Sequence, residues 1–169
     1  MDANNLKMRL RPLRSEDLCA AAKMAASTSG RCVDDLQKIY ARDLALTERV
    51  AQVGAFVNDE LIGFGRVVCV QFEASQVNQA PSGWYLLGVN VLSTHRRRGV
   101  ATLLTNWRMD WLTDRAHQLF YVAIPTNVAS IRMHEKLGFA EVRENVFMPP
   151  GLNGLTLFSR DIGVTRLVQ

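Results

Sequence analysis

Hydrophobic and polar positions recur with two different periods along this 169-residue chain, and these periods predict its first strand and helices. Alternation from Lys7 to Leu13 predicts a strand. Ser15 then offers a helix N-cap, with acidic residues in the first turn, and Gly30 is expected to end that helix. A second helix is predicted from Asp34 to Ala51. The chain therefore begins with a strand and two helices.

The middle of the chain carries strongly apolar strand patterns. Two β-rich runs flank Asn58 and Asp59, which predicts a hairpin. The run from Trp84 to Leu92 is apolar almost throughout, as expected for a central strand covered on both faces. Its irregular positions are Gly88 and Asn90, and the glycine permits a bulge.

Helices and strands alternate in the remainder of the chain. The helix after the central strand carries apolar residues at helical spacing, namely Val100, Leu103, Leu104, Trp107 and Trp111. Arg108 is expected on another face of that helix. A second buried strand covers Leu119 to Pro125, and Asn127 can cap a short helix that Gly138 ends. Two further strands around a Pro/Gly turn complete an α/β or α+β fold with a mixed sheet.

Composition fits a single domain spanning residues 1–169, because a chain of this length with 48% hydrophobic residues can bury a substantial core. No apolar run reaches membrane-spanning length and no signal-peptide pattern opens the sequence, so we expect no membrane contact and a cytoplasmic location. The 3 cysteines lack CxxC spacing and the 3 histidines lack ligand spacing, so no metal is expected. The net charge of +4 is spread along the chain, which makes nucleic-acid binding a minority interpretation.

Candidate chemistry begins at "RRRGVA", Arg96 to Ala101, where the central strand enters a tight turn that opens a helix. Such a turn aims backbone N–H groups at one point, and with the helix dipole these groups favour a multiply charged anion such as pyrophosphate. Gly99 allows close approach of a ligand, and the arginines add charge-assisted contacts. A solvated turn is the alternative, but the context favours a ligand site.

This segment resembles the acetyl-CoA motif of the GNAT superfamily of N-acetyltransferases, Q/R-x-x-G-x-G/A, which follows the central strand and opens a helix. "NVASIRMHEKLGF", Asn127 to Phe139, is similar to the N-x-x-A/S-I-x-x-Y/H-E-K-x-G-F segment of the same superfamily. The resemblance is tight over Gly83 to Val142 and looser over Leu6 to Leu18. Between Ala22 and Val50, where the family usually builds acceptor specificity, no match is found.

The resemblance implies a GNAT-like mixed central β-sheet flanked by helices, with a bulged, splayed central strand, and acetyl-CoA as cosubstrate. The residues implied for the pyrophosphate cradle are Arg96, Arg97, Arg98, Gly99, Val100 and Ala101, with backbone N–H groups as the main ligands. Val89, Asn90 and Val91 occupy the positions whose free backbone groups pair with the pantetheine arm, as an added strand would. Asn127 matches an asparagine that commonly holds the same arm, and a plain N-cap weighs about evenly against that role.

His134 stands where many relatives carry a tyrosine that protonates the leaving CoA thiolate. At helical spacing it shares a face with Val128, Ile131 and Leu137, so the imidazole is expected to point towards the core. Histidine is capable of this proton transfer, but a structural histidine that is satisfied by a carbonyl is equally compatible with the pattern.

The general base is not identified by the sequence. No Asp or Glu lies between Trp84 and Leu92, and the remaining candidates, Glu73, Tyr85 and His95, are equally well explained as surface or packing residues.

The resemblance implies acetyl transfer to a primary amine of a small molecule by direct attack in a ternary complex, and the motifs look similar to aminoglycoside 6'-N-acetyltransferase-like members. Amines of peptides or proteins are the competing acceptors. A non-catalytic acetyl-CoA binder and a nucleic-acid-binding arginine patch remain alternatives from other classes. Relatives are often dimers, so the resemblance also allows a homodimer.

Overall fold

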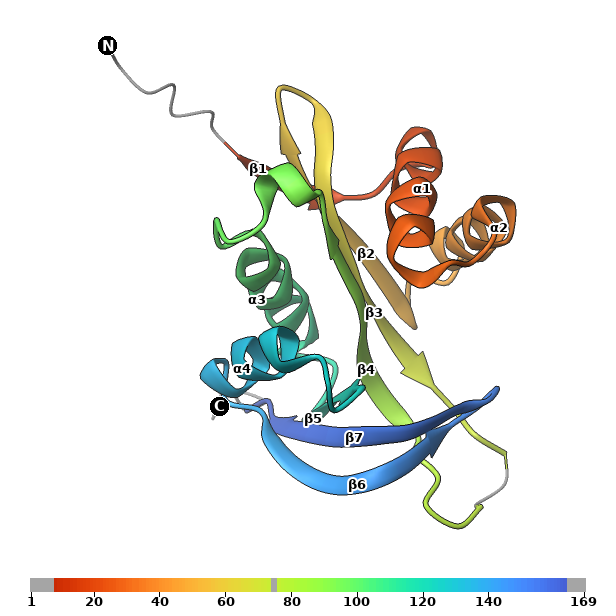
Figure 1. Ribbon diagram of the computed structural model, residues 1–169. Coiled ribbons are helices and arrows are strands. Elements are labelled where there is room, and N and C mark those ends of the chain that lie inside the picture. The colour runs from red at the N-terminus through yellow and green to blue at the C-terminus, as the bar shows by residue number, and fades with distance from the viewer. Residues whose placement is uncertain (1–7, 74–75, 164–169) are drawn as a thin grey trace, which may run out of the picture. The chain divides into compact units, whose positions relative to one another are not determined.

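The computed structural model describes residues 8–73 and 76–163. Among these residues, seven strands form one sheet in the order β1-β2-β3-β4-β5-β7-β6 (Figure 1). The strands are β1 (Arg9–Pro12), β2 (Val50–Val57), β3 (Glu60–Val70), β4 (Gly83–Val91), β5 (Gln118–Ala123), β6 (Ala140–Met148) and β7 (Leu152–Asp161). The helices are α1 (Leu18–Ser29), α2 (Val33–Leu44), α3 (Val100–Leu112) and α4 (Val128–Lys136), with single 3-10 turns η1 (Ser15–Asp17) and η2 (Ser93–His95).

The chain divides into two compact units, which are described separately. The first unit falls within residues 1–67 and 87–108, and the second falls within residues 68–86 and 109–169. The sheet is mixed, because β5 pairs in parallel with β4 and antiparallel with β7. The mixed sheet with flanking helices is confirmed, whereas the single domain over residues 1–169 stays a prediction.

Helices cover both faces of the strands in the first unit. Successive residues of β2 point to opposite sides of the sheet. Phe56 packs in one cluster with α1 and α2, while Ala55 packs in another with Val100 and Leu104 of α3. In Figure 1, α1 and α2 lie side by side, in red and orange. The first unit therefore has two apolar layers, one on each side of β2 and β3.

Two local signals in the middle of the chain are confirmed. Asn58 and Asp59 connect β2 to β3 with φ angles of 48° and 64°, the left-handed pair that a two-residue hairpin turn requires. Gly88 interrupts β4 with a φ angle of 53°, as expected where a strand is bulged. The residues that pair β4 with β5, Trp84 and Tyr85, come before this glycine.

Three expectations about the helices are wrong. Ser15 does not cap the first helix, because the Asp17 carboxylate accepts the Arg14 N–H at 2.7 Å and residues 15–17 form a 3-10 turn before α1. The second helix ends at Leu44 rather than Ala51, since its last predicted residues join β2. Arg108 is fully buried rather than on an outward face of α3. The predicted start of the first strand, Lys7, lies outside the described residues.

The second unit contains the β6–β7 hairpin and α4. In Figure 1 these two strands run as a long curved pair beside β5. Gly138 has a φ angle of 84°, and the Phe139 N–H donates to the His134 carbonyl at 3.1 Å, which confirms the predicted glycine ending of α4. Over the described ranges of the chain, no helix has the length and apolar character needed to cross a membrane.

Candidate active site

The turn from Arg96 to Gly99 gives the first unit its clearest anion-binding geometry. Arg97 and Gly99 both have left-handed backbones, with φ angles of 62° and 80°. The Leu103 N–H donates to the Gly99 carbonyl at 3.0 Å, so Gly99 is the residue from which α3 begins. The amide groups of Val100 and Ala101 consequently have no carbonyl one turn earlier in the helix. An ideal Cβ on Gly99 would meet no heavy atom within 4 Å, and this open space fits the approach of a pyrophosphate.

The three arginines of the turn do not have equal freedom. Arg96 donates from Nε to the Val91 carbonyl at 3.1 Å, which ties the turn to the end of β4. Arg97 and Arg98 are exposed. The first unit thus brings together the predicted residues of β4 and of the cradle, and it leaves two arginines available to an anion.

Asn90 is half-buried on β4, and its side chain contacts α1. Thr28 Oγ1 lies 2.8 Å from Asn90 Oδ1. An ideal Cβ on Gly88 would lie 3.6 Å from Asn90 Nδ2, so the other edge of the amide lies beside the exposed glycine. The sequence predicted a role only for the Asn90 backbone. Thr28 was not predictable, because no local pattern links two residues 62 positions apart.

Asn127 acts as the N-cap of α4 in the second unit. Its Oδ1 accepts the Ser130 N–H at 3.4 Å, which confirms the capping role. A carboxamide also carries two N–H donors that this cap does not use. The Asn127 side chain is exposed, so its donors are accessible to a ligand carbonyl, and the pantetheine role stays a prediction.

His134 is buried, at 2% exposure, which confirms that the imidazole faces the core. Its Nδ1 lies 2.9 Å from the Ser130 carbonyl oxygen, and its ring stacks on Tyr121 with centroids 3.6 Å apart. A carbonyl can only accept, so Nδ1 carries the proton, and in the neutral ring Nε2 is an acceptor. An acid role at Nε2 would therefore require the imidazolium form, and this role stays a prediction.

The contacts of Tyr85, His95 and Glu73 do not favour any of them as the general base. Tyr85 is fully buried and donates to the Pro81 carbonyl at 2.6 Å. Burial raises the pKa of Tyr85, so the phenol keeps its proton and is suited to packing rather than to proton removal. His95 Nδ1 lies 2.9 Å from Thr94 Oγ1, and Glu73 is an exposed loop residue.

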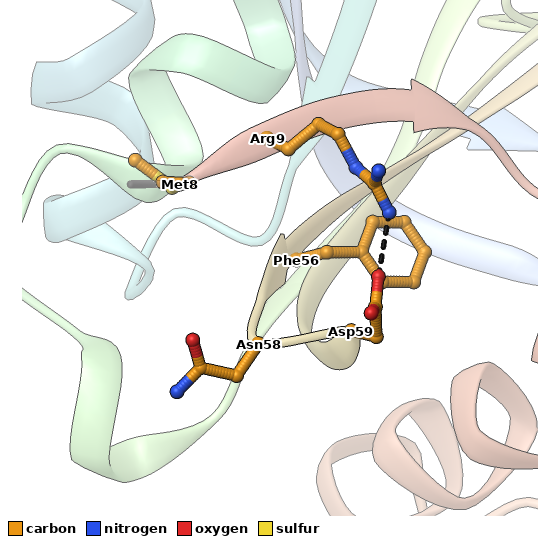
Figure 2. A pocket seen from close by; sticks show the side chains of 5 residues that line it. All are labelled: Met8, Arg9, Phe56, Asn58 and Asp59. Atoms are coloured by element: carbon orange, nitrogen blue, oxygen red, sulfur yellow. Dashed lines mark hydrogen bonds and ion pairs between the residues drawn. The ribbon is translucent and has the colours of Figure 1, made fainter. Parts of the chain in front are cut away.

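Figure 2 shows a pocket elsewhere in the first unit, between the start of β1 and the β2–β3 turn. Its lining residues are Met8, Arg9, Phe56, Asn58 and Asp59. Arg9 and Asp59 form an exposed ion pair of 2.7 Å across it. None of the predicted site residues lines this pocket, so we assign it no role in catalysis.

Comparison with known proteins adds independent findings. The model of the Acetyltransferase (GNAT) family matches residues 20–139, which is more than half of the chain. A search of the curated proteins found no significant match. The fold is similar to that of an N-acetyltransferase from Staphylococcus aureus Mu50, with a TM-score of 0.75 and 15% identity over 93% of this chain and 99% of that one.

Two further solved structures share the fold. Arabidopsis thaliana NAA60 in complex with acetyl-CoA has a TM-score of 0.70 and 20% identity, over 92% of this chain and 99% of that one. The ribosomal-protein-S18-alanine N-acetyltransferase from Escherichia coli has a TM-score of 0.70 and 19% identity, over 96% and 99%. These fold likenesses agree with the mixed sheet and flanking helices described above. The chain belongs to the GNAT family of acetyltransferases and is an acyltransferase that uses acetyl-CoA as cosubstrate.

Proposed function

We propose that the protein transfers the acetyl group of acetyl-CoA to a primary amine of a small molecule, by direct attack in a ternary complex. The observation that carries the proposal is the turn after β4, where left-handed Arg97 and Gly99 precede the first amide groups of α3. This turn supplies an anion site directly beside a bulged strand with polar backbone groups. CoA has a feature suited to each: its pyrophosphate would bind at the turn, and its extended, amide-containing pantetheine arm would bind along the strand.

Each predicted binding residue has a defined task in this proposal. Backbone N–H groups from Arg97 to Ala101 bind the pyrophosphate, and the side chains of Arg97 and Arg98 add charge. Arg96 holds the turn against Val91. Val89, Asn90 and Val91 pair with the pantetheine arm through their backbones, and Asn127 donates its free amide hydrogens to the same arm.

The reaction needs no covalent acetyl-enzyme, because a thioester is already activated. The amine lone pair attacks the carbonyl carbon, and an N–H of β4 near Val89 to Val91 stabilises the oxygen that becomes negative. The C–S bond then breaks and its electron pair leaves with sulfur. Nitrogen loses a proton to solvent, and the His134 imidazolium gives a proton to the thiolate.

A peptide amino group is the second candidate acceptor. The fold likeness to the Escherichia coli ribosomal-protein-S18-alanine enzyme, which spans 96% of this chain, favours it. The small-molecule assignment is supported by the likeness of the β4, α3 and α4 motifs to small-molecule acetyltransferases. A polycationic acceptor is disfavoured by the net charge of +4. The cytoplasmic location and the homodimer also stay predictions.

The test is release of free CoA thiol from acetyl-CoA by the purified protein. Thiol release is measured without an acceptor and then with each member of a panel of polyamines, aminoglycosides, amino acids and short peptides. Release that depends on a small amine supports the proposal, and release that depends on peptides alone favours the second candidate. Binding of acetyl-CoA without amine-dependent release from any member of the panel would contradict both.

A further inference from the structure

A side-chain contact in the first unit joins the last turn of α1 to the bulged strand. Thr28 Oγ1 lies 2.8 Å from Asn90 Oδ1 and 3.0 Å from the Ala25 carbonyl oxygen. A hydroxyl has one proton, so it donates to one of these oxygens and turns a lone pair towards the other. With both neighbours as acceptors, one of the two contacts lacks a proton.

A rotation of the Asn90 carboxamide by half a turn supplies the missing proton. Nitrogen and oxygen exchange places with little change of shape, because the two ends of a carboxamide are nearly equal in size. Nδ2 then donates to Thr28 Oγ1, and Thr28 donates to the Ala25 carbonyl. Each contact has one donor and one acceptor. The Asn90 oxygen moves to the edge beside Gly88, where an ideal Cβ would lie 3.6 Å from the amide atom.

In the proposed function, the acceptor amine reaches the thioester beside this part of β4. Gly88 is exposed, left-handed and without a side chain, so the space beside the strand is kept open. The proposed function places the thioester carbonyl against the backbone from Val89 to Val91. A nucleophile must come within about 3–3.5 Å of that carbon to react. An oxygen beside Gly88 is placed to accept a hydrogen bond from it.

From this geometry we infer that the Asn90 side chain binds the acceptor amine through its oxygen, and that Thr28 is the positioning residue that orients the amide. The inference rests on the proposed function and deepens it. An amide oxygen accepts an N–H but takes up no proton, so Asn90 aligns the amine and is not its base. The acceptor is therefore an amine that keeps an N–H while its lone pair attacks the carbonyl, which fits a primary amine.

The test compares four variants with the wild-type protein. Thr28→Val removes the hydroxyl at constant shape, Thr28→Ser restores it, and Asn90→Leu removes the amide. Ser27→Ala is the matched control, because Ser27 makes the same kind of bond within α1, to the Met24 carbonyl at 2.8 Å, without a hydrogen bond to β4. KM and kcat for the best amine of the panel are measured together with the Kd of CoA.

We expect Asn90→Leu and Thr28→Val to raise the KM of the amine about tenfold, the effect of one lost hydrogen bond to a charged or polar partner. The Kd of CoA should stay within about twofold, because the backbone of β4 is unchanged. Thr28→Ser and Ser27→Ala should match the wild type. An amine KM that is unchanged in Thr28→Val and Asn90→Leu would overturn the inference.

A second measurement tests the amide orientation without turnover. In the free protein, NMR should show that one Asn90 Nδ2 proton is hydrogen-bonded in the wild type and in Thr28→Ser, and is not in Thr28→Val. An Asn90 amide that is insensitive to Thr28→Val would contradict the orientation. Absence of amine-dependent thiol release in the wild type contradicts the proposed function itself, whereas an active wild type with unaffected variants contradicts the inference alone.

Discussion

The environment of His134 is compatible with both a structural role and a catalytic role. Its ring is stacked on Tyr121 and its Nδ1 is committed to the Ser130 carbonyl, so both packing and hydrogen bonding fix its orientation. A fixed orientation serves a core residue and a proton donor equally well. Separating the two roles requires a variant that keeps the ring and removes the nitrogens.

His134→Phe is such a variant, with His134→Ala beside it. If His134 is the acid, both changes should lower kcat about 100-fold, because a positioned acid contributes at least that factor. The Kd of acetyl-CoA should change far less, since the ring is proposed to act on the leaving thiolate. Steady-state kinetics and calorimetry provide the two readouts. A His134→Phe protein with near wild-type kcat would assign the histidine to packing.

Gly99 is expected to assist CoA binding because it has no side chain, which leaves room for the pyrophosphate beside its backbone. Gly99→Ala should weaken CoA binding about tenfold, because its Cβ would stand where the pyrophosphate approaches the backbone. Gly154→Ala is the matched control: its φ angle of 66° is similar, and its Cβ would also meet no heavy atom within 4 Å. Both variants should lose about 1–2 kcal/mol of unfolding free energy, because alanine is strained in the left-handed conformation. Equal CoA affinities in titration calorimetry would remove Gly99 from the cradle.

At the scale of elements, Arg108 attaches α3 to β3. The side chain is fully buried and donates to the Leu104 and Arg66 carbonyls at 3.1 and 2.9 Å and to Thr105 Oγ1 at 2.8 Å. Burial lowers the pKa of Arg108 to about 9, so the guanidinium is still charged at neutral pH. An ideal Cβ on Gly65 would lie 3.0 Å from the Arg108 Cζ. Glycine at position 65 therefore leaves room for the buried guanidinium.

Gly65 and Arg108 should therefore be energetically coupled. Gly65→Ala should lower the unfolding free energy by about 1–3 kcal/mol in the wild type, and by clearly less in an Arg108→Ala background. Gly63→Ala is the control on the same strand, because its crowding comes from Asn90 and Val100 and not from Arg108. Urea unfolding of the double-mutant cycle gives the coupling. If Gly65→Ala lowered the unfolding free energy equally in both backgrounds, residue 65 and the Arg108 side chain would not be energetically coupled.

The junction between β1 and α1 should respond to acid. Arg11 contacts the Asp17 carboxylate at 2.6 and 3.0 Å. Burial alone would raise the pKa of Asp17, but hydrogen bonds from Arg11 and from the Arg14 N–H outweigh it and lower the pKa below its ordinary value. A lowered pKa means that the stabilisation is present above the pKa of the unfolded chain and is lost as pH falls through that of the folded protein.

Asp17→Asn should cost about 3 kcal/mol of unfolding free energy near pH 7, and the difference from wild type should shrink as the pH falls below the ordinary aspartate pKa. Urea unfolding at several pH values measures both effects. Glu16→Gln, at the neighbouring exposed carboxylate, should cost less than about 0.5 kcal/mol. A cost for Asp17→Asn that does not vary with pH would rule out the titration of this pair.

At the scale of the whole molecule, features with local causes were predictable from the sequence. The hairpin at Asn58 and Asp59, the irregular Gly88 and the glycine ending of α4 each depend on backbone conformations that few residues adopt. The two motifs were likewise visible, because each occupies one continuous segment. These features locate β4, the turn after it and α4 along the chain.

Features that depend on contacts between different elements were not predictable. Ser15 fails as a cap because Asp17 is held by Arg11 on the preceding strand. Arg108 follows the polar pattern of α3, yet carbonyl and hydroxyl acceptors allow it to be buried. The contact of Thr28 with Asn90 joins residues 62 positions apart. In each case a contact with a different strand or helix contributes to the outcome, and no sequence period encodes that contact.

Acetyl transfer to an amine is tested most directly by mass spectrometry with trideuterated acetyl-CoA and the most active acceptor. The expected product is the acceptor amine carrying one labelled acetyl group, formed in equal amount to free CoA thiol, with no label on the protein. Thiol release without labelled amine would mean hydrolysis, and label retained on the protein would mean a covalent intermediate. Either result would contradict direct attack by the amine.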